Sequence, residues 1–105
     1  MINSDMVGQG ELEVSIGGAD VYPRDASWLD DLHGGGVPFV RTRSGNRSDH
    51  YPFHEAGVPS LDLFSGMYRR MNSKEDTAVH LDYGKIARIA RATARLVLDL
   101  SAEDR

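Results

Sequence analysis

The sequence predicts an α/β fold, in which the strands of one layered sheet alternate with helices. Short apolar segments with strand-like patterns recur at residues 12–16, 37–43 and 58–64. Segments with helical spacing lie between and after them, and the longest runs over residues 83–100. A chain of 105 residues has room for one domain, so we expect residues 1–105 to form a single one.

The composition is that of a globular protein and excludes several classes of function. The chain has 12 Lys and Arg against 16 Asp and Glu, a formal net charge of -4, so it lacks the positive field that nucleic-acid binding needs. It has no cysteine, so a metal would have to be held by His, Asp or Glu. No apolar run approaches the roughly 20 residues of a membrane span, and residues 1–10 show no signal peptide. These features do not predict a compartment.

The first half of the chain predicts three strands and one helix. Residues 1–7 are partly apolar and end in a glycine turn, which indicates a buried strand. Apolar and polar residues alternate over 11–16, the pattern of a half-buried strand, and we expect it to lie beside the first. Residues 23–33 predict a helix ended by three glycines. Residues 37–43 predict the third strand.

The second half predicts a short helix, a strand, a long loop and a long helix. Ser48 and Asp49 precede a proline-containing stretch that ends at Gly57, which indicates a capped short helix before the strand at 58–64. The polar segment 65–77 is long for a connection in so small a domain, and such loops are usually functional or mobile. The last helix begins after its cap, Asp82. Its apolar stripe is Ile86, Ile89, Ala90, Thr93, Leu96, Val97 and Leu100, and its opposite face carries Arg88, Arg91 and Arg95.

Residues that could carry chemistry lie near the predicted strand ends, where α/β sheets place their sites. Asp5 could project a carboxylate into such a site, or it could only form a turn. His50 and His54 are four residues apart and could share a metal with Asp49 or Glu55, or they could be ordinary hydrogen-bonded histidines.

Two further groups of polar residues each have two interpretations. Arg41, Arg43 and Arg47 could meet a carboxylate or a phosphate, or they could form a solvated face. Asp76 and Thr77 could contribute to a site, although we expect them to pin the long loop by bonding backbone.

Three segments in order carry a more specific signal. The first is Asn3–Gly8 (NSDMVG), and the second is Ser48–Phe53 (SDHYPF) followed by Gly57–Pro59 (GVP). The third runs from Phe64–Gly66 (FSG) through Glu75–Thr77 (EDT) to Asp82–Tyr83 (DY). Together they resemble the zinc-dependent M28 peptidases, a family of aminopeptidases and glutamate-carboxypeptidase-like enzymes. The resemblance spans nearly the whole chain but only the C-terminal part of that family's catalytic domain.

The resemblance implies a partial mixed sheet flanked by helices, the C-terminal portion of the zinc-peptidase (phosphorylase/hydrolase-like) fold. It also implies a site with two zinc ions, in which Asp5 matches the terminal Asp ligand of one zinc. Asp49 and His50 match residues that orient groups around such a site. The substrate entrance would be lined by Ser65, Gly66, Met67 and Tyr68.

The chain departs from the family's pattern at two points. Asn72 stands where the family has its C-terminal zinc-binding His, and an amide is a poor zinc ligand. The family's other ligands and its general base belong upstream of Asp5. We therefore expect this chain alone to hold no zinc pair and to hydrolyse no peptide.

The resemblance implies a function for the chain and leaves two alternatives. The chain would be the C-terminal part of an M28-like metallopeptidase of aminopeptidase type, which hydrolyses peptide bonds through metal-activated water. One alternative is a non-catalytic binding or assembly module that keeps the fold. The other is a self-contained metal site of Asp49, His50 and His54. A partial sheet would also expose an unpaired edge, which favours homo-oligomers.

Overall fold

The computed structural model describes residues 1–9, 13–18, 36–43 and 45–103. Its strands are β1 (Ile2–Asp5), β2 (Val14–Gly17), β3 (Phe39–Thr42) and β4 (Leu61–Phe64). Its helices are α2 (Tyr51–Glu55), the 3-10 helix η1 (Ala78–His80) and α3 (Tyr83–Glu103). β1, β3, β4 and α2 fall within the segments that the sequence predicts. β2 and α3 extend past their predicted ends, η1 was not predicted, and the helix expected at 23–33 lies outside the described residues.

The four strands form one mixed sheet in the order β1-β4-β2-β3. β4 runs parallel to β1 and antiparallel to β2, and β2 runs parallel to β3. The expectation that the first two strands lie side by side was wrong, because β4 inserts between them. The burial of the strands gives a physical reason: β4 buries both Leu61 and Leu63, whereas β1 is only partly buried, so the more apolar strand takes the inner position.

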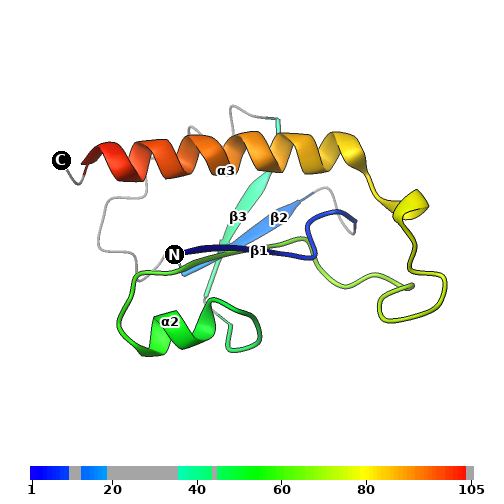
Figure 1. The fold of residues 1–105 in the computed structure, drawn as a ribbon, viewed down its shortest axis with the longest axis horizontal. Helices are drawn as coiled ribbons and strands as arrows, with labels where there is room; N and C mark the ends of the chain where they lie inside the picture. Colours follow the sequence, from blue (N-terminus) through cyan, green and yellow to red (C-terminus); the bar gives the residue numbers. More distant parts are fainter. Residues whose placement is uncertain (10–12, 19–35, 44, 104–105) are drawn as a thin grey trace.

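The two faces of the sheet differ in character because side chains alternate along each strand. The face covered by α3 carries Val14, Ile16, Phe39, Leu61 and Leu63, which form the core together with Val37 and the α3 residues Ile89, Ala92 and Leu96. Figure 1 shows α3 lying along this face, with α2 on the opposite side of the sheet. Residues of opposite parity include the polar or small Asn3, Asp5, Ser15, Gly17 and Asp62, together with the apolar Val40 and Phe64. The sheet therefore presents an apolar face to α3 and a mostly polar face away from it.

Helix α3 begins at its predicted cap. The side-chain Oδ1 of Asp82 accepts a hydrogen bond from the backbone N–H of Lys85 at 2.9 Å, which satisfies one donor of the first turn. Arg88, Arg91 and Arg95 are exposed, as expected. The helix is longer than the predicted 83–100, and no helix in the described part of the chain has the length and apolarity to cross a bilayer.

The apolar stripe of α3 is wider than the surface that the sheet covers. The buried positions are Lys85, Ile89, Ala92 and Leu96, at spacings of four, three and four. Ala90 and Val97, which the sequence placed on the same stripe, are exposed. With Leu98 they line an open apolar groove of about 680 Å³ between α3 and residues of the β1 segment, including Ser4 and Val7. The predicted buried stripe was thus right for Ile89 and Leu96 and wrong for Ala90 and Val97.

Helix α2 ends as predicted but begins differently. Gly57, just after it, has a φ of 80°, the left-handed conformation that glycine adopts readily. At the other end His50 is the N-cap residue, and its side chain makes no capping hydrogen bond. The expectation that Ser48 or Asp49 caps this helix was wrong. The physical reason is that the Ser48 hydroxyl is directed elsewhere, to a carboxylate of β1.

Candidate functional site

A cavity of about 510 Å³ opens on the polar face of the sheet, on the side away from α3. Strand residues on its floor include Asp5, Ser15, Gly17 and Asp62. Its remaining lining is Met6, Thr42, Arg43, Gly45, Asn46, Arg47, His50, Phe64, Met67 and Met71. The cavity thus collects residues from all four strands, from the segment between β3 and α2, and from the loop after β4.

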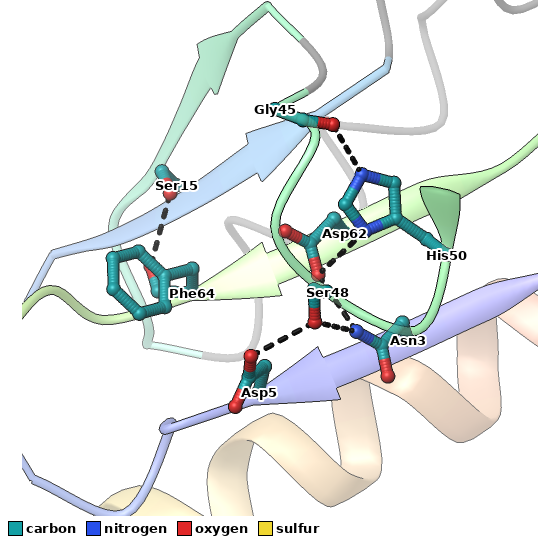
Figure 2. Close-up of polar contacts among 8 residues, drawn as sticks. All are labelled: Asn3, Asp5, Ser15, Gly45, Ser48, His50, Asp62 and Phe64. Atoms are coloured by element: carbon teal, nitrogen blue, oxygen red, sulfur yellow. Dashed lines mark hydrogen bonds and ion pairs between the residues drawn. The ribbon is translucent and has the colours of Figure 1, made fainter. Parts of the chain in front are cut away.

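Asp5 is held on this floor by a chain of hydrogen bonds, drawn in Figure 2. The Ser48 hydroxyl donates to Oδ2 of Asp5 at 2.8 Å. The amide Nδ2 of Asn3 donates to Oγ of Ser48 at 2.7 Å and to Oδ1 of Asp62 at 3.0 Å. Asn3 and Asp62 are direct partners in the β1–β4 register, so the strand pairing brings these groups together. The Asp5 carboxylate is therefore fixed in place, and this series of hydrogen bonds engages only its Oδ2.

His50 ties the segment before α2 to β4. Its ring is buried, with 1% of its surface exposed, and its Nε2 lies 2.9 Å from the backbone oxygen of Gly45. Its Nδ1 lies 3.6 Å from Oδ1 of Asp62 (Figure 2). His50 thus lies between the backbone of the segment before α2 and a carboxylate on the cavity floor.

The carboxyl of Asp62 has a pKa above its ordinary range. Burial is the largest cause, and the negative charge of Asp5 adds to it. The hydrogen bond from Asn3 and the nearby His50 both act in the opposite direction but do not cancel the burial. The folded chain therefore holds a proton on Asp62 more tightly than the unfolded chain does.

This pKa shift predicts a pH dependence of stability. Since the pKa of Asp62 is raised on folding, its contribution to the free energy of unfolding falls as the pH rises through its folded-state pKa. Asp62→Asn should remove this slope while keeping the hydrogen bond from Asn3. Urea denaturation of both chains between about pH 4 and 7 would measure it. A wild-type slope that persists unchanged in the variant would assign the dependence to another group.

Two residues near the cavity have a left-handed backbone although they are not glycine. Met6 directly follows Asp5 with a φ of 55° and lines the cavity. Asn72 has a φ of 57°, and asparagine is one of the residues that tolerate this region. Asn72 is exposed and lies outside the cavity lining, whereas its neighbour Met71 is part of it. The asparagine at position 72 thus suits the turn it occupies.

The predicted substrate residues divide between two cavities. Met67 is 68% exposed and lines the main cavity. Ser65, which is buried, and Gly66 line a second cavity of about 350 Å³ together with Glu13, Ser15 and Phe64. Tyr68 lines neither and donates a hydrogen bond from its hydroxyl to the Asp76 carboxylate. Asp76 therefore pins the loop, as expected, but its carboxylate accepts a hydrogen bond from the Tyr68 side chain and not from the backbone.

The histidine pair does not form the metal site that the sequence allowed. His50 is buried against Asp62, whereas His54 stacks on the ring of Tyr51. Asp49 is exposed and does not line the main cavity. Among the described residues, no three His, Cys, Asp or Glu side chains are grouped so that they could hold a metal ion. The hypothesis of a self-contained site of Asp49, His50 and His54 was therefore wrong.

Sequence reasoning missed Asp62 and gave Ser48 a different role. A signal for Asp62 was present, because it lies between Leu61 and Leu63 and must face away from the core that they enter. For Ser48 the sequence alone offered capping as the local explanation. Its actual acceptor, Asp5, is 43 residues away in the chain.

Comparison with known proteins gives the fold a context. The sequence profile of peptidase family M28 matches residues 1–97. Among solved structures, the chain resembles the LapA aminopeptidase of Legionella pneumophila, with a TM-score of 0.74 and 20% identity over 94% of this chain and 30% of that one. It also resembles BSAP, a zinc aminopeptidase from Bacillus subtilis, with a TM-score of 0.72 and 20% identity over 94% of this chain and 27% of that one. No curated protein matches the sequence.

These matches show which features this chain shares with the two aminopeptidases and with the family. At 20% identity the two solved structures show a common fold, and this chain spans less than a third of either aminopeptidase. The mixed sheet with flanking helices that the sequence motifs implied is confirmed. The family profile covers the segments that carry Asp5, Ser48 and the loop after β4. On that coverage, the chain belongs to peptidase family M28.

Proposed function

We propose that this chain is the C-terminal portion of an M28 metallopeptidase of aminopeptidase type, and that it contributes Asp5 as a ligand of one zinc ion. The observation that carries the proposal is the Asp5 carboxylate, held by Ser48 at the end of β1 on the floor of a cavity. Its second oxygen, Oδ1, is not engaged by Ser48, and a carboxylate oxygen is a suitable zinc ligand.

The described residues do not form a complete zinc site. A zinc site needs at least three protein ligands, and the described part of the chain offers no such group. Asp62 and His50 face each other, but Asp5, His50 and Asp62 are not grouped so that the three could hold a metal ion. Because the family's other ligands and its general base belong upstream of Asp5, we propose that they come from outside residues 1–105, and that this chain does not hydrolyse peptides unaided.

The other residues of the cavity would then have supporting roles. Ser48 orients Asp5, and Asn3 orients Ser48 in turn. His50 fixes the segment that covers the cavity. Met67 and Met71 form an apolar wall at the entrance, where a peptide would pass. Ser65, Gly66 and Tyr68 remain proposed for the substrate entrance, and Asp49 for orientation of the site.

The first test is a zinc titration of the 105-residue chain, followed by NMR. Zinc should perturb the signals of Asp5 and its neighbours weakly and reversibly, and Asp5→Asn should abolish the effect. Asp99→Asn is the matched control, because Asp99 lies on α3 away from the cavity. A perturbation confined to the histidines, or its survival in Asp5→Asn, would contradict the assignment of Asp5.

The second test is an activity assay with an aminoacyl p-nitroanilide. We expect no chelator-sensitive hydrolysis by the 105-residue chain, and such hydrolysis would contradict the proposed need for further ligands. The coding sequence upstream of Met1 is a further check, since the resemblance requires His-x-Asp and Glu-Glu motifs in frame. A longer polypeptide that has these motifs but neither zinc nor activity would favour the alternative, a non-catalytic binding or assembly module.

A Ser48→Ala substitution separates orientation of Asp5 from direct ligation. Loss of the hydroxyl leaves the Asp5 carboxylate in place but removes its hydrogen bond. Removing such a supporting bond typically lowers metal affinity or activity about 10- to 100-fold. In the zinc titration, Ser48→Ala should therefore weaken binding without abolishing it, and Ser73→Ala, in the exposed part of the loop, should not change it.

A further inference from the structure

Two arginines line the main cavity without an ion-pair partner in the described part of the chain. Arg43 follows β3, and Arg47 lies in the segment before α2. Neither is within ion-pair distance of a described carboxylate, although the chain carries 16 Asp and Glu. Arg95 on α3 differs, since its guanidinium lies 3.6 Å from the Asp99 carboxylate. Arg43 and Arg47 thus bring two positive charges to a concave surface, and neither has an ion-pair partner among the described residues.

The strand register places Arg43 across the cavity floor from Asp62, whereas Arg47 directly precedes Ser48, the hydrogen-bond partner of Asp5. Asp62 pairs with Gly17, and Gly17 pairs with Thr42, which directly precedes Arg43. Two strand spacings separate Asp62 from Thr42, a distance of about 10 Å. Gly17 lies between them and has no side chain, so the floor is open at this point. The cavity therefore has carboxylates at β1 and β4, the positive charge of Arg43 beyond β3, and the positive charge of Arg47 on the segment that carries Ser48.

The size and walls of the cavity suit a short peptide. A volume of about 510 Å³ lies within the range of small-ligand sites. Phe64, Met67 and Met71 supply apolar lining to the same cavity. An extended peptide advances about 3.3–3.6 Å per residue, so about three residues span the distance between Asp62 and the end of β3 that leads into Arg43.

We propose that Arg43 and Arg47 form a carboxylate-binding subsite, so that this cavity selects peptides with a carboxylate within about three residues of the bond to be cleaved. The position of that bond rests on the proposed function of Asp5, whereas the binding of the carboxylate does not. A guanidinium fits a carboxylate with two parallel hydrogen bonds, which gives both charge and geometry. A phosphate is disfavoured, because Asp5 and Asp62 in the same cavity repel its second negative charge.

The carboxylate has two chemical sources, the C-terminus of a short peptide and an acidic side chain. Binding to the 105-residue chain can be followed by NMR with two pairs of probes. The first pair is triglycine and triglycine amide, which differ only at the C-terminus. The second pair is Ala-Glu-Ala amide and Ala-Gln-Ala amide, which differ only in the side chain. We expect at least one carboxylate probe to bind about tenfold more tightly than its neutral partner at low salt.

The double substitution Arg43→Gln and Arg47→Gln should abolish this preference. Arg88→Gln is the matched control, because Arg88 is exposed on α3 outside the cavity and should leave the preference unchanged. Thermal melts of both variants would establish that they are folded. Equal binding within both probe pairs would overturn the proposal, and so would an equal loss of preference in Arg88→Gln.

The outcome is separable from that of the zinc titration. Selective binding of a carboxylate, together with no effect of zinc at Asp5, would support this subsite and contradict the proposed function. An effect of zinc at Asp5 without any carboxylate preference would support the proposed function and overturn the subsite.

Discussion

Gly18→Ala should destabilise this chain by about 3 kcal/mol or more, because two separate costs fall on one residue. Gly18 has a φ of 89°, and a left-handed backbone costs a residue with a Cβ about 1–2 kcal/mol. A Cβ at this position would also lie 2.2 Å from the backbone oxygen of Ser60. Ser60 directly precedes β4 and Gly18 directly follows β2, so relief of the clash would shift two paired strands. Urea denaturation at fixed pH would measure the loss.

Gly57→Ala is the matched control for this prediction. Gly57 has a similar φ of 80°, but a Cβ there would meet no atom within 4 Å. Gly57→Ala should therefore lower the free energy of unfolding only by the cost of a left-handed backbone, about 1 kcal/mol. A similar loss in the two variants would show that the close approach of Gly18 to Ser60 does not exist in solution.

Local sequence patterns predicted the elements of this fold but not how they meet. The glycines after Ile16 were correctly interpreted as the end of β2, since glycine interrupts a strand pattern. The same pattern gives no sign that Gly18 touches Ser60, 42 positions further along the sequence, and no sign that β4 separates β1 from β2. Strand order depends on pairing between segments far apart in the chain, which period-2 alternation does not encode.

The candidate site was predictable to a similar degree. Asp5 was identified because it belongs to a motif, and the structure places it on the cavity floor. Asp62 belongs to no motif, and its polar partner Asn3 comes from a different strand. For Arg43 and Arg47 the sequence left two interpretations open, a contact with a carboxylate or phosphate and a solvated face, because an arginine in a sequence does not show what lies across from it.

Leu96→Ala should cost about 2–5 kcal/mol, which approaches the whole stability of a domain of this size. Leu96 is 1% exposed and packs in the core between α3 and the sheet. Its truncation removes buried apolar surface and leaves a cavity that a rigid sheet cannot close. The change from leucine to alanine does not weaken the helix itself, because alanine has the higher helix propensity. Urea denaturation would therefore report the loss of packing alone.

Leu98→Ala tests the same chemical change two residues further along α3. Leu98 is 66% exposed and lines the open groove beside β1, so in the isolated chain its truncation should change stability by less than about 0.5 kcal/mol. A loss comparable to that of Leu96→Ala would mean that Leu98 is covered in solution. Dependence of that loss on protein concentration would identify the cover as a second copy of the chain, the association that an unpaired strand edge favours. A loss independent of concentration would contradict the placement of Leu98 on an open surface.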